Sequence, residues 1–86
     1  MAHRTVRIPL NVPDIGDAES IELVQWNASA GESVREGQEL CELVTDKAAF
    51  PLESPHDGVL VEIHVPEGAS VHVGDTLAIL ETTGSD

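Results

Sequence analysis

The side-chain amine of Lys47 is the group in this chain that most strongly suggests covalent chemistry. Lys47 is the only lysine in 86 residues, and it lies within the stretch VTDKAAF, between Asp46 and Ala48. The chain has sixteen acidic residues against four lysines and arginines, which gives a formal net charge of −12. Lys47 is thus the only side-chain amine of a strongly acidic chain, and it lies directly beside an aspartate in mid-chain.

Other residues that could support catalysis or metal binding lack the spacing that such sites need. His56, His64 and His72 have no metal-ligand spacing with the single cysteine, Cys41. We expect surface histidines, no metal site, and a Cys41 that packs as a small buried hydrophobic residue. Trp26 is better explained as a core residue than as part of a ligand site. No glycine-rich phosphate loop, Ser-His-Asp set or pair of catalytic carboxylates can be identified, so an enzyme acting alone is not expected.

Length and charge exclude several other classes of protein. A chain of 86 residues has a thin core and little room for a deep catalytic pocket. Its acidic surface repels phosphate backbones and anionic lipids, and only 2% of its residues are aromatic, too few for a base-stacking platform. No apolar run approaches the roughly 20 residues of a membrane span. We expect no nucleic acid or membrane partner, no secretion signal, and a cytoplasmic location or an organelle matrix.

Residues 21–45 and 58–82 form an internal repeat that aligns without a gap, 37 positions apart. The identical pairs are Leu23/Leu60, Val24/Val61, Gly31/Gly68, Ser33/Ser70, Val34/Val71, Gly37/Gly74, Leu40/Leu77, Leu43/Leu80 and Thr45/Thr82. Solenoid proteins need three or more repeats. Two copies indicate instead one domain with approximate two-fold symmetry.

Each copy is expected to consist of strands and turns. The apolar residues of the second copy alternate at Val59, Val61, Ile63 and Val65, as in a half-buried strand. The offset then predicts that Val24, Trp26 and Ala28 face the core in the first copy. Further strands are expected over residues 7–10, 39–44, 48–54 and 76–81. Turns are expected at the glycines, namely Gly31, Gly37, Gly58, Gly68 and Gly74.

The lysine falls between two of these expected strands, at the junction of the two copies. Asp46 and Lys47 should therefore form the tip of a hairpin, and Asp46 is a good turn former. The equivalent of Lys47 in the second copy is Gly84, which has no amine. Pro51 cannot donate a ladder hydrogen bond, which predicts an edge strand or a bulge at that position.

Three stretches, considered together, resemble the lipoyl domain of 2-oxoacid dehydrogenase acyltransferases. They are VPDIGDAESIELVQW (12–26), AGESVREGQELCELVTDKAA (30–49) and SPHDGVLVEIHVPEGASVHVGDTLAILE (54–81). The resemblance implies one lipoyl-like domain over residues 1–86, with a core of about 6–82. It implies an all-β fold, a flattened barrel or sandwich of two four-stranded antiparallel sheets with quasi-two-fold symmetry.

The same resemblance implies a non-catalytic carrier function. Lys47 would carry lipoate through an amide bond, with Asp46 and Ala48 as flanking recognition residues. The implied partners are a lipoate ligase or lipoyl transferase, a thiamine-diphosphate-dependent 2-oxoacid decarboxylase, the acyltransferase core and dihydrolipoyl dehydrogenase. The lipoyl group would swing between their active sites, in the cytoplasm or the mitochondrial matrix. The loop PDIGD (13–17) would lie beside the hairpin and help the decarboxylase recognise its carrier.

Two alternatives share this fold. A biotinyl carrier usually flanks its lysine with methionines, whereas Asp46 and Ala48 occupy those positions here, which favours lipoate. An unmodified binding or adaptor module is the second alternative. The chain also departs from the lipoyl family at Val44, where relatives often have glutamate three residues before the lysine.

Overall fold

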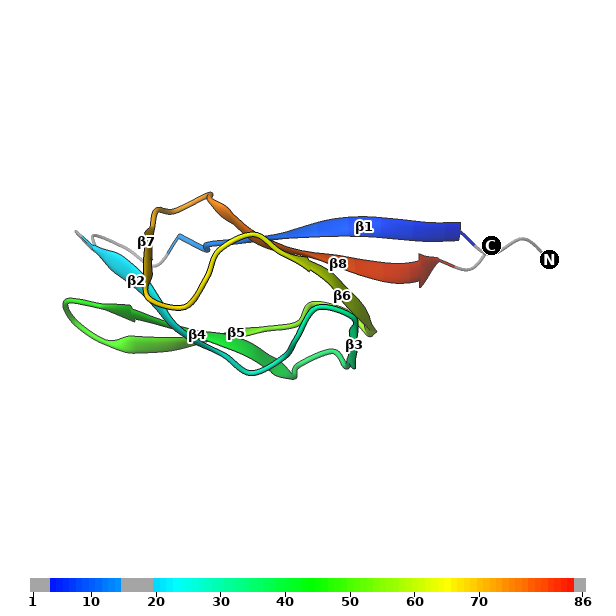
Figure 1. The fold of residues 1–86 in the computed structure, drawn as a ribbon, viewed down its shortest axis with the longest axis horizontal. Coiled ribbons are helices and arrows are strands. Elements are labelled where there is room, and N and C mark those ends of the chain that lie inside the picture. The colour runs from blue at the N-terminus through cyan, green and yellow to red at the C-terminus, as the bar shows by residue number, and fades with distance from the viewer. Residues whose placement is uncertain (1–3, 15–19, 85–86) are drawn as a thin grey trace.

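The computed structural model describes residues 4–14 and 20–84, which form eight β-strands and no helix (Figure 1). The strands are β1 (Arg4–Asn11), β2 (Ile21–Trp26), β3 (Glu32–Val34), β4 (Glu39–Thr45), β5 (Ala49–Glu53), β6 (Gly58–Ile63), β7 (Ala69–Val71) and β8 (Thr76–Gly84). One antiparallel sheet has the order β1-β8-β6-β3 and the other the order β5-β4-β2-β7. The predicted all-β fold of two four-stranded sheets is confirmed. Within the described residues the sheets form a flattened sandwich that does not close into a barrel.

The strand orders of the two sheets show the approximate two-fold symmetry that the repeat predicted. The offset of 37 residues relates β2, β3 and β4 to β6, β7 and β8, and β5 occupies the edge that β1 occupies in the other sheet. The amide of Gly31 donates to the carbonyl of Leu60, and the amide of Gly68 donates to the carbonyl of Leu23. Each copy of the repeat thus donates a hydrogen bond to the first strand of the other copy, β6 or β2.

The predicted core-facing set of the first copy is correct only in part, because β2 contains a bulge. The register between β2 and β4 shifts between Leu23 and Gln25, so that Val24 is an extra residue in the strand. A bulge adds one residue and changes which side chains face the core. Leu23 is fully buried, Val24 is 36% exposed, and Trp26 packs against the core from a half-buried position. The prediction for Val24 is therefore wrong, whereas Ala28 is buried as expected.

The second copy repeats this irregularity at the equivalent residue. The register between β6 and β8 shifts between Leu60 and Glu62, which makes Val61 the extra residue. Leu60 is fully buried and Ile63 packs against the core, three residues later instead of two. The strict alternation expected from Val59 onward is therefore wrong. The symmetry extends to the bulges as well as to the strands.

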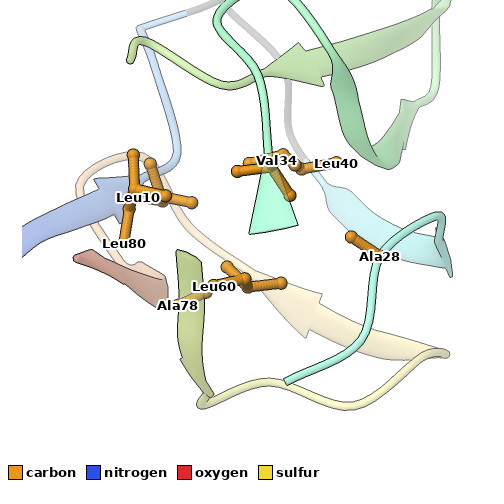
Figure 2. Packing of buried hydrophobic residues seen from close by; sticks show 7 residues of the cluster. All are labelled: Leu10, Ala28, Val34, Leu40, Leu60, Ala78 and Leu80. Atoms are coloured by element: carbon orange, nitrogen blue, oxygen red, sulfur yellow. The ribbon is translucent and has the colours of Figure 1, made fainter. Parts of the chain in front are cut away.

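The core consists of two clusters of aliphatic side chains between the sheets. The first contains Leu10, Ala28, Val34, Leu40, Leu60, Ala78 and Leu80, which converge from both sheets in Figure 2. The second contains Val12, Ile21, Leu23, Cys41, Leu43, Val71 and Leu77. Trp26 and Leu52 pack against both clusters. The two clusters are therefore bridged into a continuous core.

Four of the five glycines assigned to turns adopt the positive φ that such turns require: Gly31, Gly37, Gly68 and Gly74. Gly58 does not, and its assignment to a turn is wrong. It begins β6 and lies so close to β8 that a Cβ atom would collide with the carbonyl oxygen of Glu81 and lie 3.3 Å from Leu80 Cδ1. Close approach of two backbones is the other reason for which a strand needs glycine.

Pro51 lies in β5, an edge strand, as predicted. It is paired with Glu42 of β4. Pro9 occupies the equivalent position in β1, an edge strand of the other sheet, opposite Ile79 of β8. One edge strand of each sheet therefore contains a residue with no amide hydrogen, which limits pairing with another strand.

Candidate modification site

Lys47 lies at the tip of the β4–β5 hairpin, as the sequence predicted. The last paired residues of the two strands are Val44 and Ala49, and the amide of Thr45 donates to the carbonyl of Ala48 at 2.8 Å. Residues 46–48 form the connection, and all three are exposed. The amine is thus carried by a short, closed loop outside the packed sandwich.

The side chain of Thr45 organises this loop. Its Oγ1 accepts hydrogen bonds from the amides of Lys47 at 3.1 Å and Ala48 at 3.0 Å, and it donates to the carbonyl of Ala48 at 3.1 Å. The sequence analysis did not single out Thr45. The available signal was a threonine directly before a turn, where the hydroxyl can bond the backbone two and three residues later.

Asp46 does not have the turn-forming role considered for it. Its carboxylate is exposed and forms no hydrogen bond or ion pair with the other described residues. The amine of Lys47 likewise forms no ion pair within the described part of the chain. Ala48 contributes backbone groups to the loop, and its side chain is exposed. The structure thus brings Asp46, Lys47 and Ala48 together on one accessible tip.

The lysine hairpin occupies one end of an elongated molecule (Figure 1). The paired strands β1 and β8, which include the Lys47 counterpart Gly84, reach toward the opposite end. Because Gly84 has no side chain, the counterpart of Lys47 has no amine. The two-fold symmetry of the repeat therefore does not extend to this functional group. Residues 15–17 of the loop expected beside the hairpin lie outside the described residues.

A hollow of about 170 Å³ lies along the hairpin, formed by residues of β4 and β5. Its lining consists of Glu39, Glu42, Ala49, Phe50 and Pro51. Two carboxylates beside a small apolar surface do not form a nucleophile–base arrangement. The hollow therefore adds no catalytic set to the tip.

Cys41 is fully buried in the second core cluster, which confirms its expected role as a packing residue. Burial raises the pKa of its thiol to about 11. The thiolate is the nucleophilic form. Cys41 therefore contributes packing and is a poor nucleophile at neutral pH.

We expect this burial to protect Cys41 from alkylation. With a thiol pKa of about 11, only about one molecule in a thousand carries the thiolate at pH 8, against roughly a quarter for an unperturbed cysteine. Iodoacetamide labelling at pH 8, followed by mass spectrometry, should be at least about 100-fold slower in the native protein than in urea. Equal rates in the two states would contradict the burial, and Cys41→Ser supplies the unlabelled control.

The three histidines of the described residues lie on the surface, as expected. His56, His64 and His72 are exposed, and the described residues contain no group of three His, Cys, Asp or Glu side chains able to hold a metal. His64 Nε2 lies 2.9 Å from a carboxylate oxygen of Glu62, and Arg7 lies 3.2 Å from the other. The His64 hydrogen bond, aided by Arg7, lowers the pKa of the Glu62 carboxyl. Among the described residues there is also no helix of the length and hydropathy needed to cross a membrane.

The fold and the tip together define a class: a small two-repeat β-sandwich that presents one lysine on a hairpin. Comparison with known families gives a more particular result. The biotin and lipoyl family, described as biotin-requiring enzyme, matches residues 8–80, so the chain belongs to this family. The resemblance stated from the sequence is thereby confirmed.

Curated relatives belong to several 2-oxoacid dehydrogenase complexes. The dihydrolipoyllysine-residue acetyltransferase component of the pyruvate dehydrogenase complex of Acholeplasma laidlawii is 36% identical over 73% of this chain and 12% of its own length. The lipoamide acyltransferase component of the branched-chain alpha-keto acid dehydrogenase complex of Pseudomonas aeruginosa is 38% identical over 88% of this chain and 18% of its own length. The human mitochondrial dihydrolipoyllysine-residue succinyltransferase component of the 2-oxoglutarate dehydrogenase complex is 32% identical over 94% of this chain and 17% of its own length. The chain spans less than a fifth of each relative.

Proposed function

We propose that this chain is a lipoyl carrier domain in which lipoate is joined by an amide bond to Nζ of Lys47. The observation that carries the proposal is the exposed amine of the sole lysine at a hairpin tip, in a member of the biotin and lipoyl family. In this proposal residues 1–86 act as one domain with a core of about 6–82. The domain presents the group and catalyses nothing by itself.

The residues at the tip fit this group. Amide formation requires an amine that a ligase can reach, and the hairpin carries Lys47 outside the sandwich without an ion pair to another described residue. When attached, lipoate supplies a cyclic disulfide for acyl transfer and redox chemistry. The polypeptide contributes a rigid attachment point, and tethering raises the effective concentration of the carried group at each active site.

The partners follow from the proposed cycle. A lipoate ligase or lipoyl transferase would modify Lys47. A thiamine-diphosphate-dependent decarboxylase, an acyltransferase core and dihydrolipoyl dehydrogenase would then act on the lipoyl group that the lysine carries. Relatives that work in pyruvate, branched-chain and 2-oxoglutarate complexes support this set, at 32–38% identity. The net charge of −12 makes nucleic acid and anionic membranes poor partners. A cytoplasmic or mitochondrial-matrix location agrees with these proposed partners.

Biotin is the second candidate group, because the family description includes biotin-requiring enzymes. The residues that flank the lysine favour lipoate, since biotinyl domains usually have methionines where this chain has Asp46 and Ala48. Incubation of the unmodified protein with ATP and either lipoate and its ligase or biotin and its ligase tests this choice. Intact mass should show one lipoyl group per chain and no biotinyl group. The reverse result would establish the biotinyl alternative, and no adduct in either reaction would favour an unmodified adaptor.

The free carboxylate of Asp46 should serve ligase recognition and should contribute little to folding. Because it has no partner among the described residues, Asp46→Asn should change the free energy of unfolding by less than about 0.5 kcal/mol. The same change should lower kcat/KM for lipoate ligase by about three- to tenfold, as expected for loss of one exposed charge contact. Glu53→Gln, an exposed residue on β5, is the matched control. Equal kcat/KM values of the ligase for the two variants would show that the ligase does not recognise the Asp46 carboxylate.

A further inference from the structure

We propose that the hydroxyl of Thr45 is a positioning group that holds the Lys47 tip in the shape recognised by the modifying enzyme. This inference rests on the proposed function, because it assigns a role in the attachment reaction to a residue beside the lysine. Thr45 does not react. It acts on Lys47 through the backbone of the loop.

The hydrogen bonds of the Thr45 hydroxyl use its full capacity. A hydroxyl has one hydrogen to donate and two lone pairs to accept with. Thr45 Oγ1 donates to the carbonyl of Ala48 and accepts from the amides of Lys47 and Ala48, at 3.0–3.1 Å. One side chain thus binds both residues that follow Asp46 in the loop. The Lys47 amide, one bond from the Cα that carries the amine, is among the groups held.

The backbone of the tip does not enforce this shape by itself. Tight hairpins of two or three residues usually depend on a residue with positive φ, most often glycine. Residues 46–48 contain no glycine, and no non-glycine residue of the described chain has a positive φ. Asp46 contributes no side-chain hydrogen bond. The remaining link within the loop is the single hydrogen bond from the amide of Thr45 to the carbonyl of Ala48.

Removal of the hydroxyl should therefore loosen the tip while the sandwich remains folded. The loop is exposed, so that water can replace the lost hydrogen bonds to the amides of Lys47 and Ala48. A ligase must align the amine with an activated carboxyl group, and reaction rates fall when a reacting group is no longer held in the productive geometry. The expected effect is on attachment, with little effect on folding.

The repeat provides a matched control. Thr82 is the counterpart of Thr45 by the offset of 37 residues and is half-buried like it. Thr82 is paired with Val6 between β1 and β8, and the next two residues, Thr83 and Gly84, continue strand β8 where Asp46 and Lys47 form a loop. Thr82→Val makes the same chemical change as Thr45→Val at the end of the molecule that lacks the lysine.

The test compares the unmodified wild type with Thr45→Val, Thr45→Ser and Thr82→Val. We expect kcat/KM for lipoate ligase to fall about tenfold in Thr45→Val, to stay within about twofold of wild type in Thr45→Ser, and to be unchanged in Thr82→Val. Thermal unfolding of all four proteins should remain cooperative and similar. Amide hydrogen exchange in the unmodified wild type should show protection at Lys47 and Ala48 that is lost in Thr45→Val and retained in Thr45→Ser.

Wild-type ligase kinetics in Thr45→Val, loss of activity in Thr45→Ser despite retained protection, or unprotected Lys47 and Ala48 amides in the wild type would each overturn the inference. If Thr45→Val does not fold, two measurements still test the inference. They are the ligase kcat/KM of Thr45→Ser and the protection of the Lys47 and Ala48 amides from hydrogen exchange in the wild type. Failure of the wild type to accept lipoate would overturn the proposed function. The exchange measurement would then still report on the loop, because it uses no ligase.

Discussion

Lys47→Arg should remain at the mass of the bare polypeptide after incubation with lipoate ligase, ATP and lipoate, whereas the wild type should gain one lipoyl group. This is the largest effect that we expect, because Lys47 is the only side-chain amine in the chain. Arginine keeps the positive charge, but its guanidinium stays protonated and cannot act as the attacking amine. Intact mass spectrometry measures the outcome directly.

This loss should occur without a change in folding. Lys47 is exposed and forms no ion pair with another described residue, so that the free energy of unfolding should change by less than about 0.5 kcal/mol. Thermal unfolding followed by circular dichroism serves as the control. An adduct on Lys47→Arg would place attachment at the N-terminal amine and would contradict the assignment of Lys47.

Gly58→Ala should cause the second large effect, a loss of about 2–3 kcal/mol in the free energy of unfolding. The new Cβ would press against the carbonyl oxygen of Glu81, and its other near neighbours are Glu81 C at 3.1 Å and Leu80 Cδ1 at 3.3 Å. Backbone atoms of β8 cannot move aside without disturbing the pairing of β6 and β8. Such a loss is a large share of the roughly 5–15 kcal/mol that stabilises a typical domain. Urea denaturation monitored by Trp26 fluorescence measures the change.

Gly31→Ala is the matched control for this prediction. A Cβ at Gly31 would meet no atom within 4 Å, and the cost comes from its φ of 90° alone. We expect that cost to be about 1 kcal/mol. If Gly58→Ala were no more destabilising than Gly31→Ala, the close approach of β6 to β8 would be refuted.

The approximate positions of the main strands and the two-fold symmetry could be predicted from the sequence, because the repeat and the glycine turns are visible in it, whereas the two four-stranded sheets were implied by the family resemblance. Residues 21–45 and 58–82 share spacing as well as identities, which indicated two equivalent halves. The bulges could not be found in the same way. Val24 and Val61 look like members of a regular alternation, and only the pairing with β4 or β8 reveals the extra residue.

Gly58 was misassigned for a related reason. In the sequence it looks the same as Gly31 or Gly68, which have positive φ. Glycine is required at position 58 because β8 lies so close to it. The contact residues in β8, Leu80 and Glu81, lie more than twenty positions later in the sequence. A long-range contact of this kind leaves no local pattern in the chain.

The position of the proposed attachment residue could be predicted from the sequence, whereas the contacts that support its loop could not. The repeat and the expected strands predicted Lys47 at a hairpin tip, where the structure places it, and the family resemblance supplied its proposed role. Asp46 and Thr45 are both common turn residues, so the sequence did not distinguish which side chain closes the loop. The hydrogen bonds assign that role to Thr45 and leave the Asp46 carboxylate without a described partner.

Peptide mapping of the protein isolated from the cells that produce it tests the central claim most directly. The protein would be digested without prior ligase treatment, and the peptide that contains Lys47 would be fragmented in a mass spectrometer to locate any added group. The proposed carrier function predicts one lipoyl group on Nζ of Lys47. A biotinyl group on that atom, or an unmodified Lys47 in cells supplied with lipoate, would contradict it.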